Sequence, residues 1–341
     1  MGQGSSSVSE EPGRRRTIRD VAKAAGVSIA TASNALNGMG RTNAETRERV
    51  RRIADEIGFR PNALARSLLT RRSHSIGIIT NDTYGRLTLP MSAGVSEALV
   101  DHGVSAFLCA TNNDPRLAQL HLEALLDKQV DGIIFTATRL DLTPPVDLTR
   151  LPIPVVYAFA IGPETAPTFI PDDAQGARLA VRHLQERGYR RILHITGQED
   201  YLAARLRAEA YRDLAGEQAE VMFGAWSEEW GHEAVRRLIS SGRPRPEAIF
   251  CGSDEIARGV IDSLRDHGLK VPEDVAVVGF DNWQVVAAQT RPPLTTVDME
   301  LKELGRRAGL AMLDLTRGLP VAPGITRLPC SLVTRRSCGL A

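Results

Sequence analysis

Positions 28 to 37, SIATASNALN, carry small, neutral, hydrogen-bonding side chains where a solvated helix usually carries Glu and Lys. Such side chains suit the major groove of DNA, because Ile29 and Ala30 can contact thymine methyl groups and Asn34 can pair with an adenine edge. Other polar side chains nearby are candidates for hydrogen bonds to phosphates: Thr17, Ser28, Thr31, Ser33 and Asn37. Helical hairpins that bind nothing are common, so helical spacing alone leaves that alternative open. The residue types facing outward favour DNA.

A second group of chemically useful residues follows predicted strands or begins predicted helices in the last half of the chain. A Trp ring can stack on the apolar face of a sugar, while Arg and Asp supply donors and acceptors to its hydroxyl groups. Taken singly, each residue is better explained as a packed Trp or a surface ion pair. Their common location makes the group a candidate sugar site: Arg207, Trp226, Asp281 and Trp283.

Signals for catalysis or for a bound metal are weak. Asp172, Asp173, His183 and His194 are acid–base residue types, but they lie in no HExxH pattern, and the chain has no GxSxG. Neither GxGxxG nor a GxxxxGKS/T loop occurs, which argues against a bound dinucleotide or nucleoside triphosphate. We therefore expect no catalysis, no metal and no cofactor.

Three short helices are predicted to position the DNA-contacting residues. Thr17 is predicted to cap a helix over 18–25 that ends at Gly26, and Ser28 to cap a second over 29–37 that ends at Gly38, so the pair forms a helix-turn-helix. A third begins after Asn43 and places apolar residues on one face: Val50, Ile53, Ala54 and Ile57.

Charge separates this segment from the rest of the chain. Residues 14–72 contain 14 Lys and Arg against 5 Asp and Glu, a net charge of +9, whereas the remainder contains 28 against 36, a net charge of −8. A basic head on an acidic body is typical of a nucleic-acid-binding module joined to another function, with a solvated basic surface as the alternative. Residues 1–13 lack apolar periodicity and read as a disordered tail.

From residue 74 onward, short apolar strands alternate with helices, which predicts parallel sheets wrapped by helices. The series repeats, so we expect two doubly wound subdomains with a ligand cleft between the carboxyl ends of their strands. We assign 74–171 with 295–322 to the first subdomain and 172–291 with 323–341 to the second. The 341 residues contain no run of the roughly 18 apolar residues that a membrane helix needs, and the four cysteines form no CxxC pair. These features predict a cytoplasmic protein.

The segments TIRDVAKAAGVSIATASNALNG and RTNAETRERVRRIADEIGFRPNALARSL resemble the DNA-binding head of the lactose-repressor (LacI/GalR) family of bacterial transcription regulators. The resemblance implies that Ile29, Ala30 and Asn34 occupy the base-reading positions. The family often carries Arg where this chain has Asn34, which is a departure next to the centre of each DNA half-site.

The stretch that begins at Pro61 is long enough for about two helical turns, too few to be stable alone in water. The family uses this segment as a hinge helix that orders on DNA and wedges a leucine into the central base step. By resemblance, the DNA contacts here are Asn62, Ala65 and Leu68, with Leu68 as the wedge. The alternative is a linker with Leu68 packed against a domain. We therefore divide the chain into a head over 14–60, a hinge and linker over 61–73, and an effector-binding and dimerisation domain over 74–341.

The body resembles the family's effector domain, which is itself similar to periplasmic sugar-binding proteins. AARLRAEAY places Arg207 at the effector-binding arginine, GAWSEEW places Trp226 beside the ligand, and VVGFDN places Asp281 at the hydroxyl-binding aspartate. Trp283 lies just beyond that aspartate.

Two further segments depart from the family pattern. CGSDEIARG places Ser253 and Asp254 where the family often has Asn-Asp, so a hydroxyl replaces one ligand-binding amide. PVVYAFA leaves Phe159 where a ligand-binding aspartate usually stands, which implies a ligand that is less polar on that side or bound differently.

Together these features predict a homodimeric transcriptional repressor that binds a near-palindromic double-stranded DNA operator and senses a small molecule, expected to be a sugar. The tail carries no leucine heptads, which favours a dimer over a tetramer. The rival interpretations are a sugar-binding transport component and a sugar-processing enzyme of similar fold.

Overall fold

The computed structural model describes residues 16–37, 42–60, 72–216 and 219–339. It divides into two compact units, Met1–Ser73 and His74–Ala341, which we describe separately as the head and the body. The division falls where the sequence predicts the body to begin. The predicted tail over 1–13 and residues 61–71 of the predicted hinge and linker over 61–73 lie outside the described residues.

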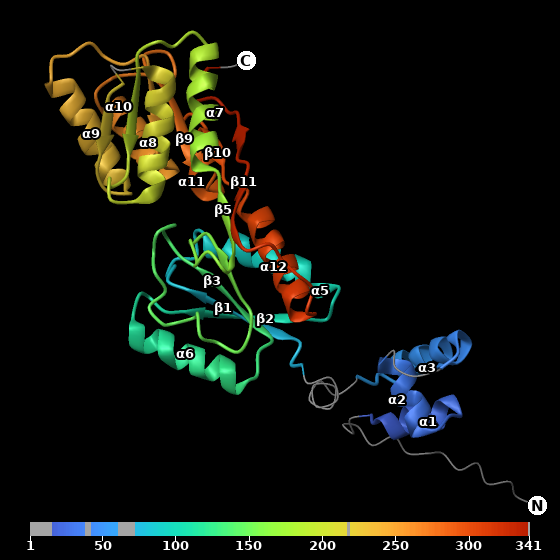
Figure 1. Ribbon diagram of the computed structural model, residues 1–341. Helices are drawn as coiled ribbons and strands as arrows, with labels where there is room; N and C mark the ends of the chain where they lie inside the picture. The colour runs from blue at the N-terminus through green and yellow to red at the C-terminus, as the bar shows by residue number, and fades with distance from the viewer. Residues whose placement is uncertain (1–15, 38–41, 61–71, 217–218, 340–341) are drawn as a thin grey trace, which may run out of the picture. The chain divides into compact units, whose positions relative to one another are not determined.

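The described residues of the head form three helices: α1 (Ile18–Ala25), α2 (Ile29–Asn37) and α3 (Ala44–Glu56) (Figure 1). Gly26 ends α1 with a φ of 64°, a left-handed conformation that glycine adopts without strain. The Ser28 hydroxyl accepts the Thr31 N–H at 3.0 Å, and the Asn43 side chain accepts the Thr46 N–H at 2.8 Å, so α2 and α3 begin at the predicted caps. One small core joins the three helices: Val21, Ala22, Ala25, Ala32, Ala35, Val50 and Ala54.

The first subdomain of the body is built on a sheet whose neighbouring strands run parallel. In spatial order the strands are β11 (Gly324–Leu328), β5 (Pro167–Pro171), β4 (Val155–Ala158), β3 (Gly132–Thr136), β1 (Ser75–Thr80) and β2 (Ser105–Ala110). The helices are α5 (Thr88–Val100), α6 (Pro115–Asp127) and α12 (Leu301–Thr316). Alternate strand residues face opposite helices, since Ile78 packs in the core with α5 and α12 whereas Ile79 packs in the core with α6.

The helices α5 and α12 approach each other closely enough for backbone contact. A Cβ atom added to Gly94 would overlap the carbonyl oxygen of Lys302, and one added to Gly305 would overlap that of Met91. Glycine is required at both positions because only its missing side chain permits this approach. The contact fixes α12, which arrives late in the sequence, against a helix that precedes it by about 200 residues.

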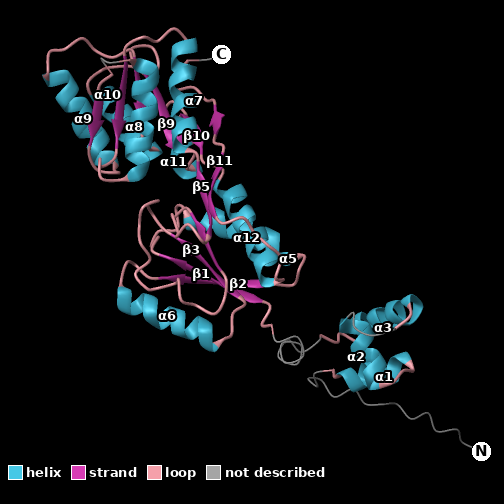
Figure 2. Ribbon diagram, in the orientation of Figure 1, coloured by secondary structure: helices cyan, strands magenta, loops and turns pink. Residues whose placement is uncertain are grey.

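The second subdomain repeats this plan. In spatial order its strands are β12 (Ser331–Val333), β10 (Thr295–Asp298), β9 (Ala276–Asp281), β8 (Ala248–Cys251), β6 (Ile192–Thr196) and β7 (Val221–Phe223). Only β12 is antiparallel to its neighbour among these described strands. The helices are α7 (Asp173–Glu186), α8 (Leu202–Ala215), α9 (Glu228–Ser240), α10 (Asp254–Asp266) and the short α11 (Gln284–Ala287) (Figure 2). The predicted fold class, a helix-turn-helix head and two doubly wound subdomains, is confirmed.

Strand pairing moves two of the predicted subdomain boundaries. Residues 295–298, predicted for the first subdomain, form β10 of the second sheet. Residues 324–328, predicted for the second subdomain, form β11 of the first sheet. These strands pair with β9 and β5, which lie far away in sequence, so local pattern could not place them. The helix α9 begins at Glu228, where the Ser227 hydroxyl accepts the Trp230 N–H at 3.2 Å. Within the described parts of the chain, no helix has the length and apolar character needed to span a membrane.

Candidate functional site

The outer surface of α2 is the first candidate site. Ser28, Ile29, Ala30 and Asn34 are exposed there, with Ile29 keeping 48% of its surface open. An apolar side chain among short polar ones in this position suits contact with base edges.

The predicted phosphate-binding residues differ in their exposure and in the hydrogen-bond partners of their hydroxyl groups. Thr17 is exposed, and its hydroxyl donates to Asp20 at 2.9 Å. Thr31 and Ser33 are half-buried, and the Thr31 hydroxyl lies 2.8 Å from that of Ser28. Three predicted DNA contacts and one side chain lie outside the described residues: Asn62, Ala65 and Leu68, and the side chain of Asn37.

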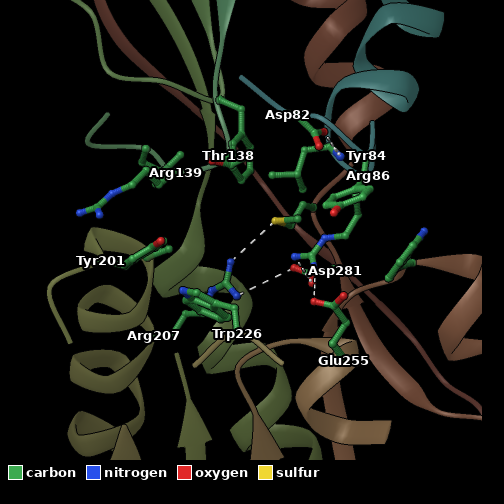
Figure 3. A pocket seen from close by; sticks show the side chains of 16 residues that line it. Asp82, Tyr84, Arg86, Thr138, Arg139, Tyr201, Arg207, Trp226, Glu255 and Asp281 are labelled. Atoms are coloured by element: carbon green, nitrogen blue, oxygen red, sulfur yellow. Dashed lines mark hydrogen bonds and ion pairs between the residues drawn. The ribbon is translucent and has the colours of Figure 1, made fainter. Parts of the chain in front are cut away.

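The second candidate site is a cavity of about 380 Å³ between the two subdomains of the body (Figure 3). Its walls come from segments that follow strands or begin helices in both subdomains, as expected for the carboxyl ends of parallel strands. The cavity is lined by five of the predicted effector-binding residues: Phe159, Arg207, Trp226, Asp281 and Trp283.

Arg207, on α8, is held rigidly at the base of the cavity and is only 3% exposed. Its Nε donates to Asp173 at 2.7 Å, its Nη1 donates to the carbonyl oxygen of Gly252, and its guanidinium lies 3.6 Å from the centre of the Phe280 ring. Burial raises the pKa of Asp173, while Arg207 opposes that shift by stabilising the carboxylate. Its Nη2 also lies 2.6 Å from Asp173 and donates to the Met299 sulfur at 3.7 Å, so one N–H, on Nη1, is left for a ligand hydroxyl.

Asp281 ends β9 with an unusual backbone. Its φ is 114° and that of Asn282 is 49°, both in the region that side chains other than glycine rarely adopt. Strain of this kind costs free energy and recurs at ligand sites, where surrounding contacts enforce it. Burial raises the pKa of Asp281, an effect opposed first by Arg86 and then by Arg207.

Aromatic rings supply the apolar part of the wall. The Trp226 and Tyr201 rings lie 5.9 Å apart, and Trp226 also lies 5.6 Å from the Arg207 guanidinium. Phe159 leaves β4 with a φ of 55° and is 5% exposed, so its ring forms part of a closed apolar surface. The ligand that the resemblance implies, less polar on this side or bound differently, stays a prediction.

Ser253 and Asp254 do not line the cavity, in contrast to the prediction. Both are fully buried. Ser253 caps α10 by accepting the Ile256 N–H at 3.2 Å. Asp254 accepts the Trp283 N–H at 2.7 Å and the Thr296 hydroxyl at 2.5 Å. The two residues therefore position the wall rather than form it.

The prediction also missed several residues that line the cavity. They share one feature, namely that each lies just after a strand or near the start of a helix, so the strand-end rule could have found them. The charged and aromatic members are Asp82, Tyr84, Arg86, Arg139, Tyr201 and Glu255. Arg139 stacks over the Tyr201 ring at 3.9 Å and lies 3.4 Å from Asp200, so it connects the two subdomains on one side of the cavity.

The acid–base residues considered for catalysis have structural environments. Asp172 caps α7 by accepting the Gln175 N–H, His183 lies 3.1 Å from the Cys338 sulfur, and His194 is buried with its ring stacked on Phe250. Among the described residues, no group of three or more His, Cys, Asp or Glu side chains is arranged to hold a metal ion.

Comparisons with known proteins match both the head and the body to known families. Residues 17–62 match a family model described as bacterial regulatory proteins of the lacI family, and residues 181–338 match one described as a periplasmic binding protein-like domain. Over 330 residues the chain is 31% identical to the HTH-type transcriptional repressor CytR of Escherichia coli (strain K12), covering 94% of this chain and 96% of the relative.

Two solved structures are similar over nearly the whole chain. A lac repressor dimer bound to operator and the anti-inducer ONPF matches with a TM-score of 0.75 and 27% identity, covering 96% of this chain and 100% of that one. A complex of the transcriptional regulator CelR with cellobiose matches with a TM-score of 0.68 and 29% identity, covering 95% and 100%.

Proposed function

We propose, from the premise that this chain belongs to the LacI family of bacterial transcription regulators, that it is a repressor whose affinity for DNA is controlled by a small molecule bound in the body. The chain is a DNA-binding regulator with an effector-binding domain, as its relatives are, and those relatives are repressors rather than enzymes. The observation that carries the proposal is the pairing, in one chain, of a neutral exposed recognition helix with a polar and aromatic cavity between two subdomains. DNA binding implies that it acts in the cytoplasm.

The head is proposed to read DNA through α2. Ile29 and Ala30 would contact thymine methyl groups and Asn34 an adenine edge, while the hydroxyls around them bond phosphates. A related structure is titled as a dimer bound to operator, and a two-fold dimer requires a near-palindromic site.

A homodimer is also supported by the edge of the first sheet. The strand β2 is an edge strand of that sheet, and Phe107 and Leu108 on it are 42% and 47% exposed. Open apolar strand edges are normally covered, because they pair readily with another chain.

The effector is proposed to be a sugar. Trp226 and Tyr201 offer ring faces to the apolar face of a pyranose, and Arg207 and Asp281 offer donors and acceptors to its hydroxyls. A structural relative is titled as a cellobiose complex.

The ligand can act only through a difference in affinity between two geometries of the cleft. Turning a mostly bound repressor into a mostly free one requires about a 10⁴-fold preference, or about 5.5 kcal/mol, shared over the sites of the dimer. The proposed receiver of that signal is the hinge and linker over 61–73, where Leu68 would wedge between bases. Leu68→Ala is expected to leave the body folded and to weaken specific binding and DNA bending, and unchanged bending in a fluorescence assay would remove the wedge from the proposal.

The test of function is a selection experiment. The purified full-length protein is incubated with a randomised duplex library, with and without a mixture of neutral sugars, and the retained DNA is sequenced. We expect a near-palindrome whose enrichment changes when the sugar is present. A palindrome that no sugar affects would retain the regulator and reject the sugar, whereas no enriched sequence under either condition would contradict DNA recognition by α2.

A further inference from the structure

Arg86 is the cavity residue with the most unusual connections. It follows β1 of the first subdomain, yet its Nη1 donates to Glu255 at 2.6 Å and its Nη2 donates to Asp281 at 2.9 Å, both on the second subdomain (Figure 3). Its guanidinium carbon also lies 5.6 Å from the centre of the Trp283 ring. One side chain thus joins the two walls across the cleft.

The loop that carries Arg86 is fixed in advance. Asp82 accepts the backbone N–H groups of Gly85, Leu87 and Thr88, each at 2.9 Å. A loop held by three such bonds to a carboxylate places the arginine without a large entropic cost on binding. The reach of Arg86 across the cleft is therefore a built feature of the loop.

The two carboxylates depend on Arg86 for their charge. Glu255 and Asp281 lie beside Asp254, and burial raises the pKa of all three. For Glu255 and Asp281, Arg86 is the largest influence opposing that shift. The position between the two carboxylates, above an aromatic ring, is also the position that an amine or guanidinium of a ligand would favour.

The other arginines that line the cavity are paired as well. Arg207 lies 2.6 Å from Asp173, and Arg139 lies 2.7 Å from Asp141. An acidic ligand would have to draw one of these arginines away from its carboxylate in a largely buried setting, which is costly. A hydroxyl group needs no such exchange, since Arg86 uses two of its five N–H donors on the carboxylates.

We propose that Arg86 acts as an internal occupant of the effector cleft, filling the place between Glu255 and Asp281 that a ligand cation would take, so that the cleft selects uncharged polyhydroxy effectors over amines and acids. This inference rests on the proposed function and adds to it the charge class of the effector. It concerns a residue that the family resemblance does not assign.

The test removes the Arg86 side chain and offers a small cation in its place. Full-length Arg86→Ala protein is titrated with ethylguanidinium, a copy of the end of an arginine side chain, and with N-ethylurea, which has nearly the same shape and no charge. We expect ethylguanidinium to raise the melting temperature of the variant saturably at millimolar concentration and to leave the wild-type protein unchanged, while N-ethylurea stabilises neither.

The matched control is Arg258→Ala, on the same helix as Glu255, where the lost arginine paired with Glu228 at the surface. It should respond to ethylguanidinium as the wild-type protein does. Equal responses of the three proteins, or equal responses to the charged and uncharged probes, would overturn the proposal. Should Arg86→Ala not fold, Arg86→Gln with guanidinium chloride at matched ionic strength provides the same comparison.

A second measurement tests selection directly. For a neutral sugar retained by the selection experiment, calorimetry compares it with its amino and uronic acid analogues. The wild-type protein should bind both analogues at least about tenfold more weakly, a difference of ~1.4 kcal/mol, and Arg86→Ala should lose only the discrimination against the amine. Unchanged discrimination in the variant would overturn the role of Arg86, whereas failure of every sugar to bind would contradict the proposed effector and leave the ethylguanidinium result standing.

Discussion

The head and the cleft present polar groups to their ligands in opposite ways. On α2 the candidate contacts lie close together in sequence and are uncharged, with Ile29, Ala30 and Asn34 exposed, and the helix that carries them begins at its own cap. In the cleft the candidate contacts come from segments up to about 200 residues apart, are largely buried, and are charged groups held by partners. The difference teaches that mutation of the cleft tests folding as well as binding, whereas mutation of α2 tests binding almost alone.

The largest effect that this comparison predicts is for Arg207→Met. The substitution leaves Asp173 buried without its partner, so the body should lose about 3–5 kcal/mol of unfolding free energy in urea titrations. Arg212→Met, which removes an exposed arginine from the same helix, should cost far less. Equal losses of unfolding free energy for the two variants would contradict the prediction that substitutions in the cleft impair folding.

Acid should weaken the body through His194. Burial lowers the pKa of His194 to about 3, and its hydrogen bond to the Phe250 carbonyl opposes this only in part. Below its ordinary pKa of 6.5 the unfolded chain takes up a proton that the folded body refuses, so the stability present above pH 6.5 is lost as the pH falls toward 3.

At pH 5 that loss is about 2 kcal/mol. Denaturant titrations between pH 7 and pH 5 give the free energy of unfolding of the wild-type protein and of His194→Gln at each pH. The loss due to His194 is the extra decrease that the wild-type protein shows over this range. Equal decreases in the two proteins would contradict the prediction.

Asn34→Ala should act on recognition rather than on folding. Losing a paired contact to a base edge is expected to cost about 1–3 kcal/mol of discrimination at one base pair, with the melting temperature of the head unchanged. Fluorescence anisotropy on the selected operator and on its single-base variants would measure this. A uniform loss across all base variants would assign Asn34 to the phosphates instead.

The smallest expected effect is for Ser28→Ala. Removing the cap that accepts the Thr31 N–H should cost the head about 1 kcal/mol, visible as an earlier loss of helix signal on heating. Adding Asn43→Ala, at the cap of α3, should lower stability by a similar further amount, because the two caps share no partner.

What the sequence could predict follows the same division. The helices of the head were predicted with their caps because Thr17, Ser28 and Asn43 act on residues three positions away. In the body, strand ends were predictable and therefore Arg207, Trp226 and Asp281 were found. Whether a given side chain faces the cavity could not be predicted. The burial of Asp254 away from the cavity depends on its hydrogen bonds with Thr296 and Trp283, which come from other strands and loops, and Ser253 precedes it.

Arg86 illustrates the same limit. Nothing near it in sequence indicates a partner, and both of its carboxylates lie more than 160 residues away. Only the facing of the two sheets brings the three together. The late strands β10 and β11 were assigned to the wrong subdomains for the same reason.

The late arrival of β11 also bears on how the chain is made. The head can close its core once its three helices, ending at residue 56, have left the ribosome. The first sheet of the body, begun by β1 at Ser75, lacks its last strand until Leu328 has been synthesised, and the second waits for β12 at Val333. During most of translation, then, a finished DNA-binding module is followed by two half-built sheets with open edges, and the ability to sense a ligand is acquired within the final few dozen residues.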